Sequence, residues 1–149
     1  MRRLRVLLAD DYSRMLTLLQ LVLEPTYQVV GTVEDGQSLI AAAQALRPDI
    51  ILTDVDMPIM NGIDAIRELR KTLPDCCVIF HSSHGEPEVM AAAFAAGGSG
   101  YVIKGSPRSL LSSIHTVIRQ VQQKEESYAF VHHESERDPL IYLSNGAGG

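Results

Sequence analysis

Three acidic residues and one lysine are the candidates for chemistry in this sequence, because each follows a short apolar run. Asp10 and Asp11 come after LRVLLA, Asp54 comes after IILT, and Lys104 comes after GYVI. Carboxylate oxygens are the ligands that Mg²⁺ prefers in proteins, and a lysine ammonium supplies a compact positive charge to a phosphate. The four side chains together are therefore suited to holding a divalent cation beside a phosphoryl group.

The apolar runs that precede these residues are short and rich in β-branched side chains, which is typical of strands buried on both faces of a parallel sheet. The groups at the carboxyl ends of such strands collect in one crevice at the sheet edge, where ligands bind. The sequence predicts five strands, at Leu4 to Ala9, Tyr27 to Val33, Ile50 to Thr53, Cys77 to His81 and Gly100 to Ile103.

Stretches with helical periodicity lie between the strands, and Ser13 is expected to cap the first of them. Strict alternation of strands and helices predicts an α/β fold, and the handedness of crossovers favours a flavodoxin-like doubly wound five-stranded parallel sheet, (β/α)5. The five expected helices run from Ser13 to Glu24, from a Glu34-Asp35-Gly36 turn to Leu46, from Gly62 to Leu73, from Glu86 to Ala96 and from Pro107 to about Lys124.

Composition narrows the class of protein. A chain of 149 residues favours one domain. The net charge of −5 argues against nucleic-acid binding by this chain alone. No stretch approaches the roughly 18 apolar residues that span a membrane. The two cysteines, Cys76 and Cys77, are adjacent and cannot staple a loop, so we expect a cytoplasmic protein with no membrane contact.

The segments LLADDY, ILTDVDMPIMNG, VIFHSS and GYVIKGSP resemble, in this order, the motif blocks of response-regulator receiver domains of bacterial two-component systems. The resemblance covers roughly residues 1 to 125, which we interpret as the receiver domain. It implies a phosphorylation-dependent signalling switch in which Asp54 accepts a phosphoryl group from a sensor histidine kinase or a phosphotransfer protein. Beyond its own self-phosphorylation and self-dephosphorylation, such a domain is not an enzyme.

The resemblance also implies roles for five other residues. Asp10 and Asp11 match the acidic pair at the Mg²⁺ site, and Lys104 matches the lysine that contacts the phosphate. Ser82 matches the switch hydroxyl and Tyr101 matches the switch aromatic residue. Lys104 and Ser82 would move toward a new phosphate and leave space into which Tyr101 turns, which would change the surface of the fourth helix.

Coordination chemistry suggests which groups hold the metal. Mg²⁺ keeps several waters, so one or two carboxylates, a backbone carbonyl and the phosphate complete its shell. We assign Asp11 and Asp54 as direct ligands, Asp10 as a water-mediated ligand and the carbonyl of Asp56 as the backbone ligand. The side chains of Asp56 and His84 are expected to flank the pocket and to set the lifetime of the phosphoryl group.

Two helices offer residues for partner binding. Leu21 falls on the polar side of the first helix and is expected to be exposed. The fourth helix has no charged residue from Val89 to Gly97, so Met90 and Phe94 are expected to form a contact surface, with good helix propensity as the alternative explanation. A homodimer is compatible with such a surface.

Residues 126–149 form a C-terminal extension or linker. Tyr128 to Val131 and Leu140 to Leu143 are apolar, which is compatible with a hairpin or with a helix extension and a loose tail. The tail is too short for a helix-turn-helix domain, although the last motif block looks most like receivers that precede DNA-binding domains. A receiver missing its DNA-binding output domain and a stand-alone receiver both remain open.

Two other functions compete with the switch. Asp54 and Asp56 form an Asp-x-Asp pair, which also serves as nucleophile and acid/base in haloacid-dehalogenase-like phosphohydrolases. There the pair follows the first strand and a cap closes the site, whereas here it follows the third strand and no cap is visible. An unphosphorylated receiver-like scaffold is disfavoured because every chemical residue is present.

Overall fold

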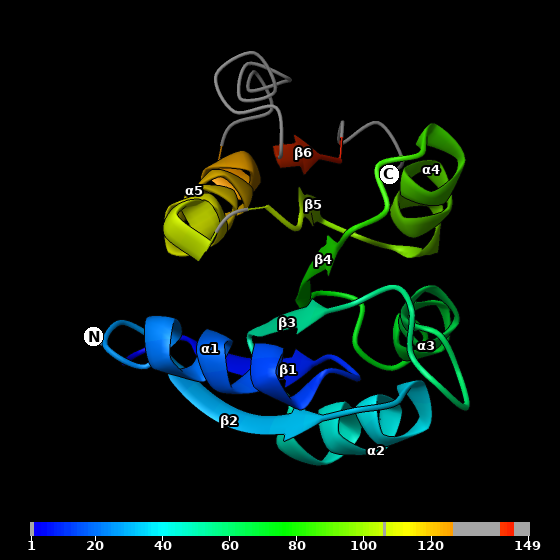
Figure 1. Ribbon diagram of the computed structural model, residues 1–149. Coiled ribbons are helices and arrows are strands. Elements are labelled where there is room, and N and C mark those ends of the chain that lie inside the picture. Colours follow the sequence, from blue (N-terminus) through cyan, green and yellow to red (C-terminus); the bar gives the residue numbers. More distant parts are fainter. Residues whose placement is uncertain (1, 106, 127–140, 145–149) are drawn as a thin grey trace.

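The computed structural model describes residues 2–105, 107–126 and 141–144. Within these residues the strands form one sheet in the order β2-β1-β3-β4-β5-β6, which Figure 1 shows with helices on both sides. The first five strands are parallel, which confirms the predicted flavodoxin-like α/β architecture. The strands are β1 (Arg5–Ala9), β2 (Gln28–Val33), β3 (Ile50–Thr53), β4 (Cys77–Ser82), β5 (Gly100–Ile103) and β6 (Ile141–Leu143).

The helices cover both faces of the sheet and each follows a strand, as the alternation predicted. The two core clusters place α1 and α5 on one face and α2, α3 and α4 on the other. Among the described residues, no helix combines the length and apolar character that crossing a bilayer requires. The helices are α1 (Ser13–Leu23), α2 (Gly36–Leu46), α3 (Gly62–Leu69), α4 (Pro87–Ala96) and α5 (Pro107–Glu126).

The central strands are apolar throughout because both of their faces are covered. On β1, Val6 and Leu8 pack into the core beneath α1 and α5, while Leu7 and Ala9 pack into the core beneath the other three helices. Successive side chains point to opposite faces of a strand, so an unbroken apolar run satisfies both cores. This double burial holds the strand ends, and thus the residues that follow them, in fixed positions.

Polar caps explain where two of the helices begin. The carboxylate of Asp35 accepts a hydrogen bond from the amide of Ser38 (2.7 Å) at the start of α2. Asn61 does the same for Asp64 (2.8 Å) at the start of α3. The predicted cap by Ser13 is wrong: Tyr12 occupies the capping position without a side-chain hydrogen bond, and Ser13 is already helical.

The third helix is shorter than predicted, because α3 ends at Leu69 rather than at Leu73. The amides of Thr72 and Leu73 both donate to the carbonyl of Leu69, at 3.0 and 2.7 Å, so the chain closes there in tight turns. Pro74 disfavours helical geometry at Leu73 alone, the residue directly before it, so the helix end at Leu69 reflects these turns.

The sixth strand departs from the predicted five-stranded sheet. β6 is antiparallel to β5 and occupies the edge of the sheet that the parallel strands leave open. Of the two segments proposed for a hairpin, Tyr128 to Val131 lies outside the described residues, whereas Ile141–Leu143 pairs with β5. The physical reason is that the edge of β5 has unpaired backbone groups, and a short apolar segment can satisfy them.

Candidate phosphoryl and metal site

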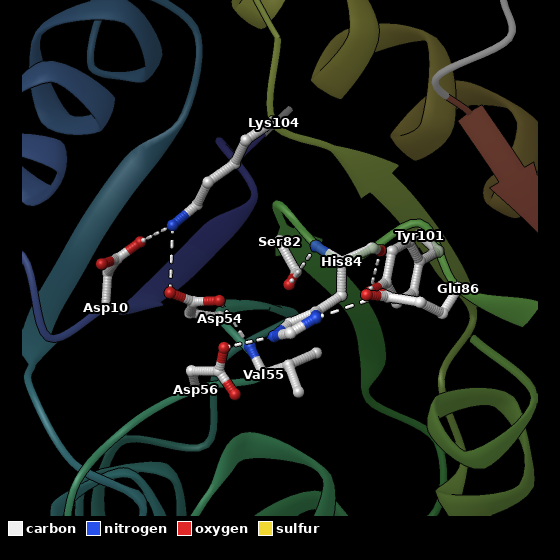
Figure 2. A network of polar contacts seen from close by, with 9 residues as sticks. All are labelled: Asp10, Asp54, Val55, Asp56, Ser82, His84, Glu86, Tyr101 and Lys104. Carbon is white, nitrogen blue, oxygen red and sulfur yellow. Dashed lines mark hydrogen bonds and ion pairs between the residues drawn. The ribbon is translucent and has the colours of Figure 1, made fainter. Parts of the chain in front are cut away.

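The residues expected to do chemistry meet at the carboxyl ends of the parallel strands. Asp10 follows β1, Asp54 follows β3 and Lys104 follows β5. The ammonium group of Lys104 lies 3.0 Å from Oδ2 of Asp10 and 3.0 Å from Oδ2 of Asp54, as Figure 2 shows. The amide of Asp54 donates to the carbonyl of Ala9 at 2.9 Å. Sheet hydrogen bonding therefore extends past the strand end and fixes the backbone of Asp54.

A carboxylate cluster surrounds this ion pair. One carboxylate oxygen from each of Asp10, Asp11 and Asp54 lies within 4.8 Å of the others. Asp10 is 1% exposed and Asp54 is 7% exposed, whereas Asp11 faces solvent. Oδ1 of Asp10 accepts the amide of Tyr12 at 2.9 Å, which fixes the direction of that carboxylate. Hard oxygen donors with one side open to water are the set that Mg²⁺ takes, so these residues fit the metal.

Burial sets the electrostatics of the pair between Asp54 and Lys104. Loss of solvent raises the pKa of Asp54; the nearby Lys104 opposes this shift and the charge of Asp10 adds to it. Burial also disfavours the charged form of Lys104, but the hydrogen bonds and charges of Asp10 and Asp54 outweigh it and raise the pKa of the ammonium. The ammonium is thus the charge that offsets two crowded carboxylates.

The loop after β3 folds tightly against the backbone of Asp54. The amide of Gly62 donates to the carbonyl of Val55 at 2.8 Å, and the amide of Val55 donates to Oδ1 of Asp54 at 2.7 Å. A Cβ atom at position 62 would lie 2.0 Å from the carbonyl oxygen of Asp54. Only glycine fits this approach, so Gly62 is part of what aims the Asp54 carboxylate.

The two switch candidates are joined through one residue of the loop after β4. The hydroxyl of Ser82 accepts the amide of His84 at 3.1 Å, and the hydroxyl of Tyr101 donates to the carbonyl of His84 at 2.7 Å. The Tyr101 ring is 0% exposed and lies between Phe80 and Phe94, at centroid distances of 6.2 and 6.4 Å. In this structure aromatic neighbours and a backbone acceptor hold the Tyr101 ring inside. The predicted turn of this ring on phosphorylation stays a prediction.

His84 bridges two loops above the strand ends. Its Nε2 contacts the carboxylate of Asp56 and its Nδ1 lies 3.2 Å from Oε2 of Glu86, as Figure 2 shows. The hydrogen bond to Asp56 is the main cause that raises the pKa of His84. Glu86 was missed by sequence reasoning, although an acid two residues after a loop histidine was its signal. The metal-binding role of the Asp56 carbonyl stays a prediction.

The residues expected to bind partners divide into two kinds. Leu21 is 66% exposed on α1, as expected. Met90 and Phe94 are half-buried and pack against the core beneath α4. Phe94 also contacts the ring of Tyr101. These two residues of α4 are therefore partly committed to the core and are not simply free surface.

Comparisons with known proteins agree with this geometry. A family model described as a response regulator receiver domain matches residues 6–130. The chemotaxis protein CheY of Thermotoga maritima is 35% identical over 101 residues, which are 67% of this chain and 84% of that protein. The nitrate/nitrite response regulator NarL of Escherichia coli K12 is 38% identical over 114 residues, which are 74% of this chain and 52% of the relative.

A solved structure shares the fold. The response regulator domain of Thermotoga maritima CheB superimposes with a TM-score of 0.76 at 30% identity, covering 82% of this chain and 98% of that domain. The chain spans most of the chemotaxis protein but about half the length of the nitrate/nitrite response regulator. The phosphohydrolase alternative is not favoured, because the relatives are signalling proteins. The chain therefore belongs to the response regulator receiver domains, a family of phosphorylation-dependent signalling switches.

Proposed function

We propose that Asp54 is the phosphoacceptor of this receiver and that Asp10 and Asp11 help it to hold Mg²⁺. One observation carries the proposal: the buried Asp54 carboxylate lies beside that of Asp10, with the ammonium of Lys104 3.0 Å from both. A buried carboxylate with a paired cation and two acidic neighbours is organised to bind a metal ion and to accept a phosphoryl group. A helix cap or a structural ion pair would not require the third carboxylate of Asp11.

The residues divide the work of phosphoryl transfer. Bound Mg²⁺ would neutralise charge on the phosphoryl oxygens. An oxygen of Asp54 forms the new bond to phosphorus while the bond from phosphorus to the donor imidazole nitrogen breaks, and the imidazole keeps the electron pair. The amide of Val55 holds Oδ1 of Asp54 in place during attack. Lys104 then follows the negative charge from the carboxylate to the phosphoryl oxygens.

The phosphate is coupled to the surface through the loop after β4. If the hydroxyl of Ser82 turns to the phosphate, it releases the amide of His84 that it now accepts. The carbonyl of His84 accepts a hydrogen bond from the hydroxyl of Tyr101. A change at Ser82 is therefore transmitted through His84 to the Tyr101 ring, which contacts Phe94 of α4. Phosphorylation can shift the equilibrium between two conformations of the chain only if these contacts differ between them.

The partners follow from the family. We propose a sensor histidine kinase or a phosphotransfer protein as the phosphodonor, and self-dephosphorylation as the reaction that ends the signal. The exposed Leu21 on α1 and the apolar residues of α4 are the surfaces proposed for partners or for a second copy. Direct nucleic-acid binding is not proposed for this acidic chain, although its GYVIKGSP block resembles that of receivers that precede DNA-binding domains. The adjacent cysteines Cys76 and Cys77, which cannot staple a loop, fit a cytoplasmic compartment.

Acetyl phosphate with Mg²⁺, followed by the intact mass of the protein, tests the proposal. We expect one phosphoryl group per chain, and none when EDTA removes the metal. Rapid turnover of many phosphomonoesters without a stable adduct would support the phosphohydrolase instead. If neither an adduct nor turnover appears, the chain acts as an unphosphorylated scaffold.

A further inference from the structure

The C-terminal strand occupies the edge of the sheet that carries Tyr101. β6 runs antiparallel to β5, and Figure 1 shows it in red beside that strand. The pairing continues past the strand, since the amide of Ser144 donates to the carbonyl of Ser99 at 3.2 Å. The paired residues are Gly100 with Leu143, Tyr101 with Tyr142 and Val102 with Ile141.

The side chains of β6 contribute to both cores. Ile141 is 1% exposed and belongs to the core cluster beneath α1 and α5, and Leu143 packs against the same cluster. Tyr142 points to the other face, where it packs against the cluster that contains Tyr101. An apolar, aromatic, apolar sequence at the strand period of two therefore matches the two faces of the edge. β6 is bound by its side chains as well as by its backbone.

Gly100 lies where β5 meets both α5 and β6. A Cβ atom at Gly100 would lie 2.5 Å from Cγ1 of Val117 on α5 and 3.6 Å from Cδ2 of Leu143 on β6. Glycine thus lets α5 close on β5, and Leu143 of β6 lies at ordinary contact distance beside it. A larger residue at position 100 would displace Val117.

Tyr142 lies directly opposite Tyr101 in the pairing of β5 with β6. Residues directly opposite in an antiparallel pair project from the same face, with Cβ atoms about 4.5 to 5.5 Å apart. The Tyr101 ring lies inward, against Phe80 and Phe94, with its hydroxyl on the carbonyl of His84. An outward ring would lie over the sheet edge, and that position is adjacent to Tyr142.

We propose that the β5 edge is a strand-binding surface whose occupant is the chain's own Ile141–Leu143, and that this strand holds Tyr101 inward. The regulatory meaning rests on the proposed function: the position of Tyr101 would then depend both on phosphorylation of Asp54 and on the binding of β6. Two ligands that favour the same conformation strengthen each other's binding. A partner that binds the β5 edge must displace β6, and its matching chemistry is an extended apolar, aromatic, apolar segment.

Chemical nitration of tyrosine in the unphosphorylated full-length chain tests the proposal, because tetranitromethane modifies accessible rings and mass spectrometry locates them. Tyr12, which is 54% exposed, reports the intrinsic rate, and Tyr27, which is 6% exposed, reports that the fold is intact. We expect Tyr142→Ala to raise the nitration rate of Tyr101 about three- to fivefold, the scale of losing one cross-strand aromatic pair. Tyr142→Phe keeps the ring and should leave the rate of Tyr101 unchanged.

Ile141→Asp provides an independent variant, because a charge in the core undocks the strand. Nitration of Tyr101 and hydrogen exchange of the β5 amides should both rise in it. The proposal is overturned if Tyr101 stays as protected in Tyr142→Ala as in the wild type, or if the β6 amides of the wild type exchange like unstructured chain. No step involves phosphorylation, so a failure here is separate from a failure of Asp54 as acceptor. Nitration of Tyr27 in Ile141→Asp would mean that this variant has lost its fold. The comparison of Tyr142→Ala with Tyr142→Phe then tests the proposal alone.

Discussion

Replacing Lys104 with methionine removes the positive charge at the centre of the site while keeping an unbranched side chain of nearly the same length. Lys104 reaches Asp10 and Asp54 at 3.0 Å each, and these carboxylates have side chains that are only 1% and 9% exposed. In Lys104→Met both carboxylates lose their shared cation and repel each other. We therefore expect the metal-free variant to be less stable than the wild type.

The size of the effect follows from burial. Removing one partner of a fully buried ion pair costs about 3–5 kcal/mol, and an exposed pair contributes about 0.2–1 kcal/mol. The Lys104 side chain is 22% exposed, so its pair lies near the buried limit. We expect a loss of about 2–3 kcal/mol in the free energy of unfolding, between these limits and nearer the buried one. Mg²⁺ should restore most of this loss, and should bind the variant more tightly because no ammonium competes for the carboxylate oxygens.

Urea unfolding followed by circular dichroism, in EDTA and again in Mg²⁺, measures both effects. Lys71→Met is the matched control, since its ammonium lies 3.1 Å from Glu68 while both side chains are more than half exposed, at 68% and 53%. The control should lose about 0.5 kcal/mol or less, with no dependence on metal. If Lys104→Met loses no more stability than Lys71→Met in EDTA, the carboxylates do not depend on this cation and the electrostatic reasoning is wrong.

Three further changes test other parts of the site. Gly62→Ala should destabilise the fold by about 1–3 kcal/mol in urea titration and slow phosphorylation, because a methyl group displaces the Asp54 carbonyl; an unchanged midpoint would contradict this. Ser82→Ala should leave phosphorylation nearly intact while blunting the phosphate-dependent change in partner binding or dimerisation, which equal responses of the two proteins would exclude. Asp56→Ala or His84→Ala should change the dephosphorylation rate several-fold, where about fivefold corresponds to roughly 1 kcal/mol. The folded pKa of His84 is raised by Asp56, so the stabilisation from this ion pair is fully present below the unfolded pKa of about 6.5 and is lost as pH rises through the folded pKa. The dephosphorylation rate of the wild type should change over that pH range, and that of His84→Ala should not.

The layout of the site was predictable because the fold itself brings strand ends together. An apolar run followed by an acid or a lysine is visible in the sequence, and parallel strands place those residues at one edge of the sheet. Asp10, Asp54 and Lys104 are therefore near neighbours for a reason that requires no knowledge of side-chain conformation. The exposure of Leu21 follows in the same way from helical periodicity.

Other features depend on contacts that the local sequence does not encode. The pairing of β6 joins residues far apart in the chain, and its three residues are too few to predict a strand with a particular partner. The bridge from Asp56 through His84 to Glu86 depends on how two loops fold toward each other. The inward position of Tyr101 depends on rings contributed by β4 and α4.

The identity of the phosphoacceptor is the central claim, and the mass of three proteins after treatment with acetyl phosphate and Mg²⁺ tests it most directly. The wild type and Asp56→Asn should each gain one phosphoryl group, whereas Asp54→Asn, which keeps the shape of the side chain but loses the nucleophilic oxygen, should gain none and should remain folded by circular dichroism. A folded Asp54→Asn protein that is phosphorylated to the same extent as the wild type would place the acceptor at another residue and contradict the account.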